Sequence, residues 1–439
     1  MKIKVHTLKI DTNKILKQIN RALKSKAIDL IYIVVIVTTL MIVDTLIFKR
    51  QFNFSKYFQI TIATSISLTY FLSLIVDLVS NKIEQKIEDS LKLNYDFAEL
   101  EKMYSGDKER FVTNTIINKR KSDLDKESFP VILEYFNLGN MRLSIIDEPN
   151  KHYQLPEFVE DNFRELFNSH KHSNIFNSLH IRLDNVVVKD NNVTMYTSRT
   201  TYYNSLVTNR AMDKEIEKNL TVRSMYEFDN RISKLEISKL SNHIGINGIV
   251  ETKDKKFIFA SRFGNVSIGK NTLGCSVGAS LKAKYALNKD GRFDLNGLEN
   301  GIINEIKDEL FILKTSGAKR NYDFSISKNI VAIYRDLLEG GKPQLLFYIR
   351  CGLNSFDIKR LFESKKDSKS KEQKKLIRDG FELLFLDPDR IILEKDELVY
   401  EKQNGIKKRY KILPSVSASI VLVLRYKKYI EEKNNLQSM

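Results

Sequence analysis

Three carboxylates lie close together in the sequence shortly after residue 300. Glu305, Asp308 and Glu309 have the spacing i, i+3, i+4, so on a helix they share one face. Apolar residues recur with helical periodicity between them, which predicts an amphipathic helix within 291–312, behind a glycine-containing loop. Such an acidic face either holds a divalent cation or is an ordinary solvated helix surface.

A second group with chemical potential combines aromatic rings with guanidinium and amide groups. Rings stack on bases and guanidinium groups bind phosphates, so the combination suits a nucleotide. The alternative is a tyrosine-rich strand that packs on a sheet. The group consists of Arg199, Tyr202, Tyr203, Asn209 and Arg210.

Alternating strand-like segments are expected to position both groups. Residues 180–205 predict two strands around a turn at 189–192, and residues 243–262 predict two strands around a polar turn at 252–255. Residues 331–350 predict a helix-like turn, a Gly-Gly-Lys-Pro break and a buried strand. Residues 413–433 predict a terminal helix that is too short and too mixed to span a membrane.

Composition narrows the class of protein. A chain of 439 residues with 42% hydrophobic residues has room for two or three globular domains. Its net charge of +17 suits an anionic membrane surface, a phosphorylated ligand or a nucleic acid. The positive charge is dispersed, and part of it precedes the first apolar run, so a nucleic-acid polymer is the weakest of these interpretations. Cys275 and Cys351 have no metal-binding spacing, and we expect both to be small buried side chains.

Two apolar runs near the N-terminus predict a pair of transmembrane helices. Residues 30–48 and 57–80 each have about the length that crosses a bilayer, and no signal-peptide cleavage pattern follows the first. Eight lysine and arginine residues precede residue 30, whereas the connecting loop has three. The positive-inside bias therefore predicts a multi-pass membrane protein with both termini cytoplasmic and with membrane lipids as partners.

Small hydroxyl residues recur every four positions in the second run. Such a stripe lets helices approach closely, either within the hairpin or between copies of the chain in a homo-oligomer. Acidic residues in both runs are costly in a membrane and suggest a role in assembly. The candidate assembly residues are Asp44, Thr61, Ser65, Thr69, Ser73 and Asp77.

The predicted fold class is α/β, as an α+β mixed sheet with flanking helices, behind the N-terminal two-helix transmembrane hairpin. Its expected segments follow one another along the chain. They are a basic N-terminal segment (1–29), the two spans (30–80), a stalk helix (81–104), an α+β extension (105–235) and a ligand-binding domain (236–439).

The last of these segments resembles the Nudix fold. The order of strand, turn, strand, glycine-rich segment and acidic helix matches that family, and its signature block Arg-Glu-aliphatic-x-Glu-Glu-x-Gly-aliphatic falls on residues 304–312. Glu305, Asp308 and Glu309 keep the family's metal-binding carboxylates. Four positions depart from the signature: Asp290 at the first glycine, Asn296 at the upstream glutamate, Asn304 at the arginine and Phe311 at the last glycine.

The resemblance implies a domain that holds a phosphorylated nucleoside without cutting it. Hydrolysis in the family needs magnesium held by carboxylates, and the loss of a ligand and of the arginine loosens that site. No cofactor is then required. The cations on segments that line the family's ligand cleft are Arg262, Lys270, Arg335 and Arg350.

Domain order extends the resemblance to the two-transmembrane Nudix effectors of CBASS antiphage systems. This implies an effector of the bacterial inner membrane that binds a cyclic oligonucleotide, oligomerises and disrupts that membrane. The alternative is a membrane-anchored, magnesium-dependent Nudix hydrolase of a nucleoside diphosphate derivative, which would use the three carboxylates at 305, 308 and 309.

Overall fold

The structure is a computed structural model. It describes residues 70, 73, 92–114, 127–139, 141–170, 176–216, 220–262, 268–269, 271–314, 321–366, 382–394 and 396–437. The chain divides into two compact units, Met1–Glu88 and Asp89–Met439. Tyr70 and Ser73, both helical, are the described residues of the first unit, so the elements below belong to the second.

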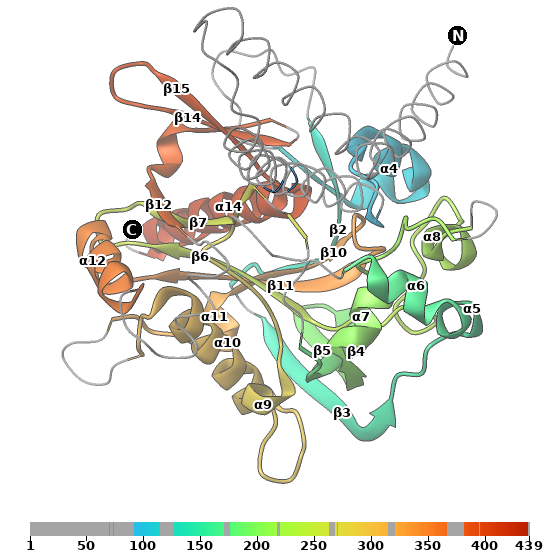
Figure 1. Cartoon of the computed structure of the whole chain (residues 1–439). Helices are drawn as coiled ribbons and strands as arrows, with labels where there is room; N and C mark the ends of the chain where they lie inside the picture. Colours follow the sequence, from blue (N-terminus) through green and yellow to red (C-terminus); the bar gives the residue numbers. More distant parts are fainter. Residues whose placement is uncertain are drawn as a thin grey trace, which may run out of the picture. The chain divides into compact units, whose positions relative to one another are not determined.

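A nine-stranded mixed sheet forms the centre of the second unit (Figure 1). Its main path runs β1-β2-β10-β11-β6-β7-β12, while β9 pairs with β6 and β8 pairs with β7. The β11–β6 pair is parallel and the other pairs are antiparallel. The strands are β1 (Phe111–Thr113), β2 (Ser128–Phe136), β6 (Gly245–Glu251), β7 (Phe257–Arg262), β8 (Thr272–Gly274), β9 (Val277–Ser280), β10 (Ile330–Asp336), β11 (Lys342–Arg350) and β12 (Glu382–Leu386).

Helix α14 (Pro414–Gln437) covers one face of this sheet, and α10 (Leu295–Leu310) covers the opposite face together with a three-stranded sheet (Figure 1). That smaller sheet has the order β3-β5-β4 and consists of β3 (Arg142–His152), β4 (Leu179–Lys189) and β5 (Asn192–Thr201). Each face of the central sheet therefore has its own apolar core, in which Leu346 points to α14 and Phe347 to α10. A third sheet contains β13 (Ile391–Leu393), β14 (Glu397–Glu401) and β15 (Lys407–Lys411).

Short helices connect these layers. They are α4 (Phe97–Met103), η1 (Ser105–Arg110), α5 (Glu157–Asp161), α6 (Phe163–Asn168), α7 (Tyr202–Val207), α8 (Val222–Tyr226), α9 (Ala283–Ala286), α11 (Ile326–Asn329), α12 (Ser355–Lys366) and η3 (Pro388–Arg390). Strands β1 and β2, from residues 105–235, lie in the same central sheet as seven strands from residues 236–439.

Several predicted elements are confirmed. The turn at 189–192 separates β4 from β5, the turn at 252–255 separates β6 from β7, and the terminal helix is α14. Cys275 and Cys351 are buried free thiols, and burial raises the pKa of Cys275 to about 11.

The prediction for residues 331–350 is wrong in its first part. The segment that reads as a helix-like turn is strand β10, which pairs with both β2 and β11 and is buried along its whole length. A strand covered on both faces has no polar alternation, so its apolar run does not distinguish it from a buried helix.

The predicted stalk helix over 81–104 falls partly outside the described residues. Within the described part, the chain is irregular at residues 94–96 before α4 begins at Phe97. The Asp96 side chain accepts a hydrogen bond from the Glu99 amide and so caps a new helix at this point.

The transmembrane part of the expected fold class is corrected by the structure. Within the ranges described above, no helix combines the length and the apolar character needed to cross a membrane. Even α14, with 24 residues, carries Arg425, Lys427 and Lys428 near its middle. The described chain is a mixed α/β unit, and this finding contradicts the hairpin and the multi-pass inner-membrane localisation. The two apolar runs behind that prediction lie outside the described residues apart from Tyr70 and Ser73, as do Asp44, Thr61, Ser65, Thr69 and Asp77.

Candidate functional site

The predicted acidic helix exists as α10, but its carboxylates do not form one solvated face. Asp294 caps the helix by accepting a hydrogen bond of 2.7 Å from the Gly297 amide. Glu305 is 1% exposed and lies among the buried apolar residues of the helix. Both of its carboxylate oxygens accept from Lys282 Nζ, at 2.7 and 2.9 Å. Asp308 accepts from the Tyr285 hydroxyl at 2.7 Å.

This arrangement does not fit a magnesium ion. A hard divalent cation needs several oxygen ligands around one point, and the ammonium group of Lys282 lies against both oxygens of Glu305. Among the residues that the structure describes, no three His, Cys, Asp or Glu side chains could hold a metal ion together. Glu305, which stands at a glutamate position of the family's signature, therefore has a structural partner.

Three of the predicted ligand-binding residues are built into the fold. Arg199 is 1% exposed, and its two terminal nitrogens each donate at 2.7 Å to the carboxylate of Asp147. Arg335 is 2% exposed and donates to backbone carbonyls at 2.6 and 2.7 Å. Asn209 is fully buried and donates to the Asn242 side chain at 3.1 Å. These groups position segments and are not available to a ligand in this conformation.

The remaining candidates of this segment lie closer to a surface. They are Tyr202 and Tyr203, at the start of α7, and Arg210, three residues after its end. Tyr203 packs edge-on against Phe167, with ring centroids 4.8 Å apart. Arg210 donates to the Tyr202 hydroxyl at 2.7 Å and forms an ion pair of 3.4 Å with Glu339. Tyr202 and Arg210 thus form one hydrogen-bonded unit, which the buried carboxylate of Glu339 holds in place.

Two histidines that the sequence analysis did not single out lie beside Tyr202. The ring centroids of His180 and His243 are 5.3 Å apart, and Tyr202 is 5.7 Å from His180. His243 shares a hydrogen bond of 2.9 Å with Ser280. Burial, together with the nearby charges of Lys282 and Arg210, lowers the pKa of His180 to about 4. Burial also lowers the pKa of His243, so both rings are neutral at pH 7. His180 lies in β4 and His243 precedes β6, so the sequence around each histidine carries no signal for this pairing.

Arg262 differs from the other predicted arginines. It ends β7, is half-buried, and lies against the bare backbone of β8 and β9. A Cβ atom on Gly274 would come within 2.7 Å of its Nε, and one on Gly278 would collide with its terminal nitrogen. Across the described part of the chain, its guanidinium has no hydrogen-bond or ion-pair partner. The side chain opposite Gly278 in the β6–β9 ladder is Asn247, a half-exposed amide that donates to the Tyr334 hydroxyl.

The last two predicted cations are at the periphery. Arg350 is 61% exposed at its side chain, donates to the Tyr348 hydroxyl at 3.1 Å and lies 3.6 Å from Glu251. Lys270 lies outside the described residues. The structure therefore does not bring the eight described ligand candidates into one cluster, and among these eight Arg262 is the cation that lacks an internal partner.

Comparison with known proteins does not assign the chain. No protein-family model matches it, and no curated protein matches it.

Proposed function

We propose that the unit Asp89–Met439 binds a phosphate-bearing nucleotide without hydrolysing it, and that Arg262 binds its phosphate. The observation that carries this proposal is the guanidinium of Arg262, which lies on glycine backbone and has no internal acceptor among the described residues. The resemblance to Nudix effectors adds the ligand class, a cyclic oligonucleotide.

The chemistry of Arg262 favours a phosphate oxygen over a neutral ligand. A guanidinium presents two parallel N–H groups that match two phosphate oxygens. Half-burial removes part of its hydration, and an incoming anion would replace the lost hydrogen bonds. Because Gly274 and Gly278 have no side chains, a ligand can approach the sheet backbone closely at this point.

The contacts of α10 support binding without hydrolysis. Cleavage of a diphosphate by this type of helix needs a metal ion on its carboxylates, and Glu305 is paired with Lys282. Binding energy can then serve a conformational change instead of a reaction, provided that the ligand prefers one state of the protein. We propose that this state is a homo-oligomer.

The test is a titration of the full chain with a panel of cyclic di- and trinucleotides, followed by sizing and by analysis of the nucleotide for cleavage. We expect Arg262→Gln to weaken binding by roughly 10-fold or more, because a charged hydrogen bond contributes about 1.5–3 kcal/mol. Arg425→Gln, an equal change of charge at an exposed position of α14, is the matched control and should bind like the wild type.

Three results would count against the proposal. They are no binding of any panel member by the wild type, equal affinity of the two variants, and magnesium-dependent release of a mononucleotide that Glu305→Gln abolishes. The last result would support the hydrolase alternative instead.

A further inference from the structure

The turn of the β10–β11 hairpin is buried, although turns usually lie at a surface. Every residue from 336 to 342 is buried, including Asp336 at 2%, Glu339 at 7% and Lys342 at 2% exposed. Gly340 and Gly341 have φ angles of +62° and +73°, which favour glycine. A Cβ atom on Gly340 would lie 2.6 Å from the sulfur of Met212, so the preceding segment encloses the turn tightly.

One side of this turn holds the Tyr202–Arg210 unit. The carboxylate of Glu339 accepts from Lys342 at 3.2 Å and pairs with Arg210 at 3.4 Å. Its backbone carbonyl accepts from the Asn209 side chain at 2.9 Å. A displacement of Arg210 therefore acts directly on the turn.

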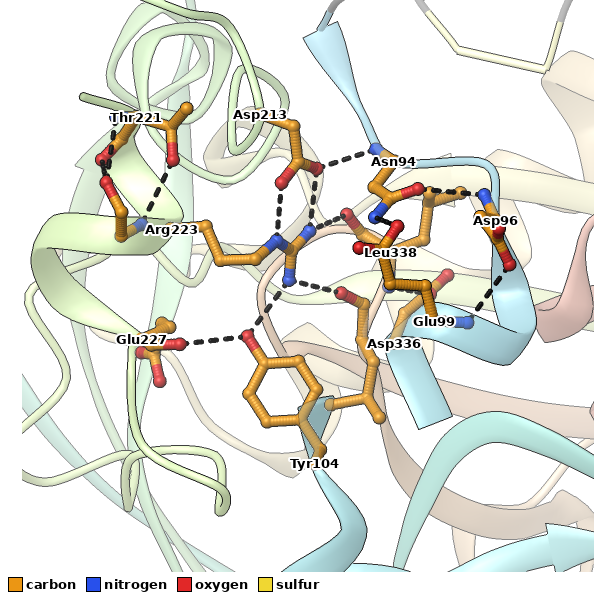
Figure 2. A network of polar contacts seen from close by, with 12 residues as sticks. Asn94, Asp96, Glu99, Tyr104, Asp213, Thr221, Arg223, Glu227, Asp336 and Leu338 are labelled. Atoms are coloured by element: carbon orange, nitrogen blue, oxygen red, sulfur yellow. Dashed lines mark hydrogen bonds and ion pairs between the residues drawn. The ribbon is translucent and has the colours of Figure 1, made fainter. Parts of the chain in front are cut away.

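The other side of the turn holds Arg223, as Figure 2 shows for the carbonyl of Leu338. The carbonyls of Leu337 and Leu338 each accept from Arg223 at 3.0 Å. The same guanidinium donates to both carboxylate oxygens of Asp213, at 2.6 and 2.9 Å, and to the Tyr104 hydroxyl at 3.0 Å. Arg223 is 4% exposed, so breaking one of these contacts leaves a buried charge without its partner.

Asp213 carries the contact to the start of the second unit. Its carboxylate accepts from the Asn94 amide at 2.6 Å (Figure 2). Its own amide donates to the Lys92 carbonyl at 2.9 Å. The segment that it fixes begins three residues after Asp89, the first residue of the unit. Any mechanical effect on Met1–Glu88 through the chain has to pass along this segment.

We propose that the buried turn is a relay that couples the Tyr202–Arg210 unit to residues 92–104. Its parts are Tyr202, Arg210, Glu339, the carbonyls of Leu337 and Leu338, Arg223, Asp213 and Asn94. Because buried charge pairs in series are costly to break one at a time, the relay has two states, intact and released. The relay goes beyond the proposed function, because its contacts exist without a nucleotide.

Hydrogen exchange of the full chain tests the relay without a ligand, so its failure is distinct from a failure of nucleotide binding. Glu339→Gln removes the charge that holds Arg210 and Lys342. We expect amide exchange in α4 and at Tyr104 to accelerate about 10-fold or more, since release of a charged hydrogen bond is comparable with the free energy of local opening. The matched control is Glu251→Gln, which removes a carboxylate that is 4% exposed and pairs with Lys427 outside the relay.

Equal exchange of α4 in the two variants would overturn the proposal, as would acceleration that is uniform over the whole chain. If Glu339→Gln does not fold, Tyr202→Phe removes only the hydroxyl that accepts from Arg210. Acceleration at α4 in that variant supports the relay, and unchanged exchange there contradicts it.

Discussion

At the scale of single residues, burial decides which charged groups are available. Arg199 and Arg335 carry the chemistry that suits a phosphate, but each is enclosed by acceptors from its own chain. Arg262 has the same chemistry on a glycine surface and lacks such an acceptor among the described residues. Residue type therefore identifies the candidate phosphate-binding side chains. Their hydrogen bonds within the chain then distinguish the cations that stabilise the fold from a cation that can bind a ligand.

The Asp147–Arg199 pair gives a prediction for pH dependence. Burial alone raises the pKa of Asp147, but hydrogen bonds from Arg199, Phe293 and Thr197 outweigh it and lower the pKa below 3.8. The pair therefore stabilises the fold fully above the unfolded pKa, and this contribution is lost as the pH falls through the lower folded pKa. We expect Asp147→Asn to lower the free energy of unfolding by about 3 kcal/mol at pH 7, because Arg199 keeps a buried charge.

Urea unfolding at pH 7 and at about pH 3 measures the effect, and the difference between wild type and variant should narrow at the lower pH. Asp387→Asn breaks a half-exposed ion pair with Arg390 and is the control, with an expected change of about 0–1 kcal/mol. A difference that stays constant between the two pH values would show that the charge of Asp147 does not account for it.

At the scale of elements, close packing places helix α10. Gly297 faces α9, and a Cβ atom there would lie 1.9 Å from the carbonyl oxygen of Ala286. A Cβ atom on Gly301 would lie 2.5 Å from a methyl group of the Leu281 side chain. The two glycines let α10 approach the end of α9 and the Leu281 side chain, which in turn brings Glu305 within reach of Lys282.

We expect Gly297→Ala to destabilise the protein by about 1–3 kcal/mol, because overpacking against a backbone atom outweighs the gain of about 1 kcal/mol in helix propensity. Asn300→Ala, at an exposed position of the same helix, is the control and should be neutral or slightly stabilising. Thermal unfolding of the two variants compares them. A Gly297→Ala variant as stable as the control would contradict the packing shown for α9 and α10.

Local patterns predicted several elements but few of their partners. The turn at 189–192 and helix α14 follow from short-range signals, and both are confirmed. The sequence of β10 predicts a helix-like turn and not a strand, because both faces of this strand are buried and its pattern has no polar alternation. The partner of Glu305 could not be predicted, since Lys282 is 23 residues away and a spacing rule applies only within one helix. The pairing of Arg199 with Asp147, 52 residues apart, depends in the same way on the tertiary fold.

At the scale of the whole molecule, helix α4 is a part of the core of the second unit. Phe97, Leu100 and Tyr104 are buried in the core beneath α14, and Asn94 is tied to Asp213. A domain that starts at Ser105 therefore lacks part of its own core. The natural boundary lies at Asp89.

We expect the fragment Asp89–Met439 to unfold cooperatively. A fragment of residues 105–439 should be less stable by several kcal/mol, at about 1.5–3 kcal/mol for each buried side chain lost. Urea denaturation followed by circular dichroism compares the two fragments. Equal midpoints would mean that α4 contributes nothing to the core.

The buried turn at 336–342 also has a consequence for synthesis of the chain. The turn is enclosed by Met212, Ile232 and Leu240. These residues leave the ribosome about a hundred residues before the turn is synthesised. Until β10 and β11 emerge, these apolar side chains have no hairpin to cover. The nascent protein thus exposes an apolar surface while the intervening segment is translated. We expect a chaperone to bind the nascent chain during this interval.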